Sequence, residues 1–173
     1  MGFLKRIIRI INSINNSMFI LIGIIFIVIS LVVFYDVVAR YVFNQPSSFG
    51  FDLSGWLNGT AAFLGGGLLL LRNEHIRIDL FYDKLSAVKR SIIDIFVSIF
   101  VLLVAFSLLK LGMDRVIFMF ERGSIASTGF NVPLWIRWII VPIGGLLLGL
   151  QSLTLLIKDI YFLCTGRKLE EGA

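Results

Sequence analysis

The chain has 173 residues, of which 58% are apolar and only 16% are charged, and its formal net charge is +5. A soluble domain typically carries about 25% charged residues, so this composition excludes an ordinary soluble globular protein. The single cysteine, Cys164, excludes an intramolecular disulfide and a thiolate metal site. The excess of positive charge is expected to orient the chain in a membrane and to contact anionic lipid.

Residues 1–17 are predicted to form an amphipathic helix that lies in the membrane interface. Apolar residues recur there at helical spacing, and basic residues lie largely off that stripe. The stripe holds Phe3, Leu4, Ile7, Ile8, Ile11 and Ile14, and Lys5, Arg6, Arg9 and Asn12 lie beside it. The same pattern also fits a helix that simply continues the first membrane span into the cytoplasm, and periodicity alone does not separate the two.

Four stretches are long and apolar enough to cross a bilayer, which takes about 20 mostly apolar residues. They run approximately from Met18 to Tyr35, from Phe49 to Leu71, from Ser91 to Leu109 and from Trp138 to Ile157. The predicted fold is therefore all-α, with a four-helix membrane domain over residues 18–158 and a tail over residues 159–173. Eleven of the sixteen Lys and Arg residues lie in the segments on the amino-terminal side of the membrane. Both termini and the tail are thus expected in the cytoplasm, and the three tryptophans near the outer interface.

The end of the first span carries charges that are candidates for contact with a partner. Asp36 and Arg40 are four residues apart, so they can pair on one helix face. Pro46 marks a turn, and Asp52 opens the second span, where a carboxylate must be paired or hydrated. We expect Arg40 and Asp52 to lie at an outer interface with a partner, although a solvated helix end is the commoner role of such charges.

Small residues are expected to mediate helix packing in the second and fourth spans. In membranes, small side chains in line allow close approach of a second helix. The second span carries Gly55, Gly59, Ala62 and Gly66 at such spacing, and the fourth carries Gly145, Gly149 and Ser152. The third span reads as apolar on all sides and bare of small residues, and its helical spacing continues past Lys110. Pro142 is expected to kink or interrupt the fourth helix.

The polar segment after the second span holds the only histidine of the chain, His75, between Arg72 and Arg77. No second imidazole or cysteine surrounds it, so bis-histidine ligation of a haem within one chain is excluded. We interpret Arg72, His75 and Arg77 as a polar cluster that contacts a neighbouring subunit. No catalytic, metal or cofactor site is predicted, and no enzyme activity.

Three segments resemble the small membrane subunit, DctQ, of tripartite ATP-independent periplasmic (TRAP) transporters. The first contains Arg40, Tyr41, Pro46 and Asp52, although the family usually has Glu in place of Asp52. The second is His75–Asp79, which matches a His-Ile-Arg-[Val/Ile]-Asp motif, and the third contains Pro133, Trp135 and Pro142. The resemblance covers nearly the whole chain.

The resemblance implies a multi-pass protein of the bacterial inner membrane with no catalytic role. Its partners would be a large DctM-like membrane subunit, a periplasmic substrate-binding protein and membrane lipids, with no nucleic acid. The small subunit would brace the static part of the large one during sodium-driven uptake of an organic acid such as a dicarboxylate, keto acid or sialic acid. Two alternatives stay open: an autonomous four-helix transporter or channel acting as a homodimer, and a membrane anchor of a redox enzyme.

Overall fold

The computed structural model describes residues 2–72, 85–126 and 132–167. In this part of the chain the regular elements are helices, and they follow the order of the predicted spans. They are α1 (Gly2–Tyr41), α2 (Gly50–Leu71), α4 (Ala87–Glu121), α5 (Leu134–Trp138) and α6 (Ile140–Thr165). The helical spacing that continues past Lys110 is confirmed, because α4 ends only at Glu121.

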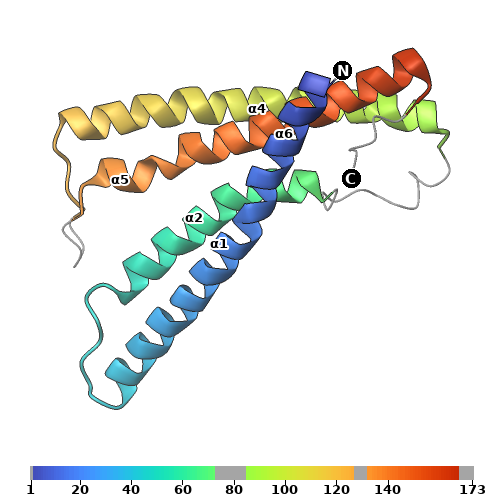
Figure 1. Cartoon of the computed structure of the whole chain (residues 1–173). Coiled ribbons are helices and arrows are strands. Elements are labelled where there is room, and N and C mark those ends of the chain that lie inside the picture. Colours follow the sequence, from blue (N-terminus) through green and yellow to red (C-terminus); the bar gives the residue numbers. More distant parts are fainter. Residues whose placement is uncertain (1, 73–84, 127–131, 168–173) are drawn as a thin grey trace.

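The helices form two antiparallel pairs that diverge from one another (Figure 1). One pair consists of α1 and α2. In the other, α5 and α6 follow one another and together run antiparallel to α4, and we call this the α4–α6 pair. The turn between α1 and α2 and the connection between α4 and α5 lie on the same side of the molecule, which we call the turn end. Towards the opposite end α1, α2 and α6 converge, and we call this region the junction.

Three units are long and apolar enough to cross a membrane: Lys5–Tyr41, Ala87–Glu121 and Leu134–Thr165. The helix α2 is not among them, although it has 22 residues. Its first half holds Asp52, Ser54 and Asn58, and its many glycines add almost no hydropathy. Three of the four predicted spans are thus supported by length and composition.

The helix α1 is continuous over 40 residues. The amphipathic segment and the first span therefore belong to one helix, with no break near residue 17. Placement of residues 1–17 in the membrane interface stays a prediction.

The helix α6 is the central element of the bundle. In its most apolar stretch 44% of the residues are buried, against 11% in α4 and 6% in α1. A small core of Ile25, Ala61, Leu64 and Leu147 joins α1, α2 and α6. The outer faces of α1 and α4 expose rows of large apolar side chains, as expected for helices surrounded by lipid or by another membrane protein.

The contact between α4 and α6 corrects one reading of the sequence. The buried residues of α4 are Ser91, Ser98, Ala105 and Gly112, which are all small and recur every seventh residue. The third span is therefore not bare of small residues. A repeat of seven keeps one face of a helix against its neighbour, so this small-residue seam lets α6 approach α4 closely.

Across this seam, α6 contributes its own small residues and a proline. A Cβ atom at Gly112 would lie 2.9 Å from Cδ of Pro142, and one at Gly145 would lie 3.1 Å from the carbonyl oxygen of Ala105. The hydroxyl of Ser152 donates a hydrogen bond to the carbonyl oxygen of Ser98 at 3.0 Å. The second helical pair is consequently closely packed over much of its length.

The predicted interruption by Pro142 is present at Ile139, which separates α5 from α6. A proline ring clashes with the carbonyl group four residues earlier, and that group belongs to Trp138, the last residue of α5.

Candidate functional site

The turn between α1 and α2 is closed by Asp36. Its carboxylate accepts hydrogen bonds from the backbone nitrogen of Ser47 at 3.0 Å and from the Ser47 hydroxyl, and the hydroxyl in turn accepts one from the nitrogen of Gly50 at 3.0 Å. The guanidinium of Arg40 lies 3.0 Å from the other oxygen of Asp36. The ion pair expected from the spacing of four is thus present, and Asp36 has a structural role in the turn.

Arg40 itself is directed outward. Its side chain is 55% exposed, whereas that of Asp36 is 16% exposed. An exposed guanidinium held in place by a half-buried carboxylate can still offer hydrogen-bond donors to a partner or to a lipid headgroup. The backbone of Gly50 packs directly against Asp36, where a Cβ atom would lie 3.1 Å from Cβ of Asp36.

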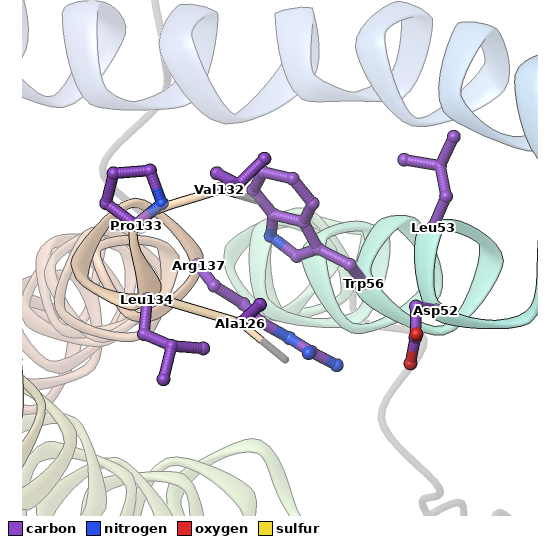
Figure 2. Close-up of a pocket in the computed structure, with 8 residues that line it drawn as sticks. All are labelled: Asp52, Leu53, Trp56, Ala126, Val132, Pro133, Leu134 and Arg137. Atoms are coloured by element: carbon purple, nitrogen blue, oxygen red, sulfur yellow. The ribbon is translucent and has the colours of Figure 1, made fainter. Parts of the chain in front are cut away.

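A small pocket at the turn end brings α2 next to the segment that leads into α5 (Figure 2). Asp52 and Trp56 line it from the first turns of α2, and Arg137 lines it from α5. The remaining lining residues are Leu53, Ala126, Val132, Pro133 and Leu134. The guanidinium of Arg137 extends from α5 towards the side of α2 (Figure 2). Asp52 is half-buried, so this pocket places a carboxylate and a guanidinium at the mouth of the space between the two helical pairs.

The connection before α5 is held by a short antiparallel bridge. Ile125 pairs with Pro133, and backbone hydrogen bonds join Leu134 to Ser124 at 2.9 Å and Ala126 to Val132 at 3.1 Å. These bonds fix where α5 starts, and they therefore position Arg137 and Trp138 relative to α4.

Aromatic and basic side chains gather at the turn end of α4 and on α5. The guanidinium of Arg115 lies 5.5 Å from the centre of the Trp138 ring, and that of Arg122 lies 4.2 Å from the Phe118 ring. Trp135 packs edge-on against Phe120. Indole and guanidinium groups favour the interface between lipid and water. The residue types at this end of the molecule are therefore those expected at a membrane–water interface.

A groove runs inward from the pocket between α2 and α5–α6. Gly55, Gly59, Thr60 and Phe63 line it from α2, and Arg137, Trp138, Ile140 and Val141 line the other wall, with Trp56 at its outer end. It encloses a volume of about 180 Å³. The groove ends where α2 and α6 touch, because a Cβ atom at Gly144 would lie only 2.7 Å from the carbonyl oxygen of Phe63.

The glycines that the sequence singled out differ in what they contact. Gly145 and Gly149 lie against α4, where a Cβ atom at Gly149 would be 3.3 Å from that of Ala105, and Gly66 faces Leu148 at 3.4 Å. Cβ atoms at Gly55 and Gly59 would meet no atom of another described element within 4 Å, and Ala62 is exposed. The structure therefore brings the α6 glycines and Gly66 together with neighbours inside the chain, whereas Gly55 and Gly59 border open space.

Of the predicted polar cluster after the second span, the structure describes Arg72 alone. This residue follows the last turn of α2, and its guanidinium lies 4.3 Å from the centre of the Phe19 ring of α1. His75 and Arg77 lie outside the described residues.

The junction contains buried polar side chains that sequence reasoning missed. Asn15 of α1 donates a hydrogen bond to Oε1 of Gln151 of α6 at 3.0 Å, and Gln151 donates one to Oδ1 of Asn12 at 3.1 Å. Asn15 and Gln151 have no exposed surface. The sequence does hold one signal of this contact, which is the amide of Gln151 in the middle of a long apolar run. Such a group needs a hydrogen-bond partner inside the membrane, so its position predicts a polar contact with another helix.

Comparison with known proteins agrees with this architecture. Residues 29–161 match the family described as tripartite ATP-independent periplasmic transporters, DctQ component. The chain is 29% identical over 126 residues to the ectoine TRAP transporter small permease protein TeaB of Halomonas elongata. The aligned region is 72% of this chain and 64% of the relative. The chain is also 26% identical over 155 residues to a putative TRAP transporter small permease protein of Haemophilus influenzae. This aligned region is 90% of this chain and 94% of the relative.

Proposed function

This chain belongs to the DctQ component family of TRAP transporters, and from that membership we propose that it works as a non-catalytic brace. It is a small permease subunit of the bacterial inner membrane. In the proposal it holds the static part of a large DctM-like subunit while that subunit takes up an organic acid, driven by sodium and supplied by a periplasmic binding protein. The substrate would be a carboxylate such as a dicarboxylate, a keto acid or a sialic acid.

The observation that carries this proposal is the chemistry of the buried polar side chains. Within the described residues they are Asn12, Asn15, Ser91, Ser98, Gln151, Ser152 and Thr154, which are all neutral. Coupling transport to an ion gradient usually relies on ionisable or ion-coordinating groups in the membrane interior. Neutral groups that hydrogen-bond between helices instead support a rigid, stationary element.

The outer faces of α1 and α4 support the same role. Large apolar side chains such as Phe26, Phe34, Phe96 and Phe100 are more than half exposed. Such faces suit contact with lipid or with a large membrane subunit, and a small subunit that presents them on two sides can widen the stationary part of a complex.

We further propose that α2 crosses the membrane as a fourth span and that both termini are cytoplasmic. The helix α2 packs along α1 and against α6, and 22 residues of helix extend about 33 Å, which matches the hydrocarbon thickness. The excess of Lys and Arg on the amino-terminal side supports the orientation. Labelling with a membrane-impermeant thiol reagent, in intact spheroplasts and in inside-out vesicles, tests both statements. Single cysteines at Arg6, Val42 and Val88 in a Cys164→Ser background report on the two ends of α1 and on the far end of α2, and native Cys164 reports on the carboxyl terminus.

Reconstitution into liposomes tests the bracing role against an autonomous transporter. The chain alone is expected to pass no solute, and the chain together with its large subunit and binding protein is expected to take up substrate along a sodium gradient. Candidate substrates for the assay include the organic acids named above and ectoine, which the name of the Halomonas elongata relative gives. Transport by the chain alone would favour a homodimeric channel or transporter and overturn the proposal.

Charge reversal tests whether Arg40 and Asp52 contact a partner. Arg40→Glu and Asp52→Lys are expected to reduce uptake by the complete system without lowering the amount of the chain in the membrane. Arg167→Glu serves as a control, because it reverses an exposed charge just after α6, at the opposite end of the molecule from the turn end. Wild-type uptake in both test variants would remove these residues from the interface.

A further inference from the structure

The junction is held by a set of amides that we call the amide latch: Asn12 and Asn15 on α1 and Gln151 on α6. Oε1 of Gln151 accepts a hydrogen bond from Nδ2 of Asn15 at 3.0 Å, and its Nε2 donates one to Oδ1 of Asn12 at 3.1 Å. Asn15 also donates to the backbone carbonyl of Ile11 at 3.2 Å. Both polar atoms of Gln151 are thereby paired with groups on a different helix.

The environment of the amide latch makes these hydrogen bonds costly to break. Asn15 and Gln151 are fully buried, Asn12 is 9% exposed, and Ile8 and Thr154 beside them are almost fully buried. In an apolar surrounding a buried amide without a partner is strongly unfavourable. The two helices therefore keep the relative position at which all three amides pair.

The helix α2 completes the amide latch at Gly67. A Cβ atom at this position would overlap Oδ1 of Asn15 and would lie 3.1 Å from the carbonyl oxygen of Leu147. Oδ1 of Asn15 is buried and accepts no conventional hydrogen bond from the described residues. It lies against the backbone of Gly67, where a Cα–H group can act as a weak donor. Three helices, α1, α2 and α6, thus meet at one polar point.

The position of the amide latch gives it control over the shape of the molecule. The α1–α2 pair and the α4–α6 pair diverge towards the turn end, where the groove between α2 and α5–α6 is open. The two pairs meet at the apolar core around Leu147, at the contact of Gly144 with Phe63, and at the amide latch. Hydrogen bonds depend more strongly on direction than apolar contacts do, so the latch restricts the angle at which the pairs can pack. We propose that the amide latch is a conformational device that sets the angle between the two helical pairs and so the width of the groove.

Distance measurements between spin labels test this proposal directly, and independently of any role in transport. The full chain is placed in lipid nanodiscs with Cys164→Ser, and labels are attached at Val42 and Ile125, which are 70% and 60% exposed at the two turns. A change of about 10° in the angle moves the turns by about 5 Å, because twenty helical residues span about 30 Å. Gln151→Leu and Asn15→Leu are expected to shift and broaden the Val42–Ile125 distance distribution.

Two controls separate an altered angle from general loosening. Labels at Ile125 and Ile160 report on the α4–α6 pair alone, and their distance is expected to stay at its wild-type value in the latch variants. Ser152→Ala removes a buried hydrogen bond between α6 and α4 within that same pair, so it is expected to leave the Val42–Ile125 distance unchanged. A wild-type Val42–Ile125 distribution in both latch variants would overturn the proposal.

A double variant keeps the test decisive if a single variant fails to fold. Each single change leaves an amide buried without its partner, whereas Asn15→Leu combined with Gln151→Leu removes both amides of the direct hydrogen bond. The double variant is therefore expected to lose less thermal stability than the sum of the two single losses, and still to show the broadened Val42–Ile125 distribution. Losses that add, or a wild-type distribution in the double variant, would show that the amides do not act together.

Discussion

The contact between α2 and α6 uses glycine in two different ways at its two ends. Towards the junction, Gly67 and Gly144 lie so close to the neighbouring helix that an added Cβ atom would overlap Asn15 or Phe63. Towards the turn end, Gly55 and Gly59 border an open groove. The spacing of small residues therefore identifies a helix face that can be approached closely. Whether the chain itself makes that approach depends on where the two helices cross.

Gly144→Leu, at the closed end, should have the largest effect on stability. The Cβ atom alone would lie 2.7 Å from the carbonyl oxygen of Phe63, so the two helices must separate to admit a larger side chain. Overpacking of this kind costs about 1–3 kcal/mol, and more where backbone must move. Thermal unfolding of the purified chain, followed by tryptophan fluorescence, measures the loss. Gly23→Leu is the matched control, because a Cβ atom there meets nothing within 4 Å; equal losses in the two variants would contradict the close contact.

Asp36→Leu should have an intermediate effect, and it tests the turn that joins α1 to α2. One oxygen of the carboxylate accepts both hydrogen bonds from Ser47 and the other accepts one from Arg40, whereas a leucine side chain of similar size accepts none of them. We expect a lower Tm and faster proteolysis in residues 42–49. Arg40→Gln is the control, since it removes only the exposed ion pair, which typically contributes little. A larger loss for Arg40→Gln would mean that the ion pair, and not Ser47, holds the turn.

Gly59→Leu, at the open end, should have the smallest effect on stability. Open space at this position predicts a change in the free energy of unfolding within about 0.5 kcal/mol, as for other substitutions away from close contacts. The new side chain would nevertheless fill the groove, so co-purification with the large subunit should decrease if that subunit enters the groove. A loss of Tm as large as that of Gly144→Leu would show that the groove is closed in the folded protein.

The helices were predictable because their signal is repeated over many residues. The second span was expected over residues 49–71, and α2 extends from Gly50 to Leu71. The predicted spans are shorter than α1, α4 and α6, since hydropathy detects apolar length and these helices continue through polar residues beyond it. The interruption near Pro142 follows from one residue with a strict backbone requirement, and it was also foreseen.

The site was harder to predict because its signals are short or depend on the crossing geometry. The small-residue seam of α4 was missed, since each of its members stands alone among large apolar residues and only a period of seven reveals it. Asn15 and Gln151 are 136 positions apart, and no local pattern shows that they meet. Gly55 and Gly67 have the same side chain on the same helix, so sequence alone could not tell which of them contacts a neighbour.

The unbroken length of α1 limits how the protein can sit in its bilayer. Forty helical residues extend about 60 Å, twice the thickness of the hydrocarbon layer, which is about 30 Å. A helix of that length can lie along one leaflet and also cross both only if it bends. Without a bend, either its first third extends out of the hydrocarbon layer, or the whole helix tilts by up to about 60° from the membrane normal, far beyond the average tilt of about 20°.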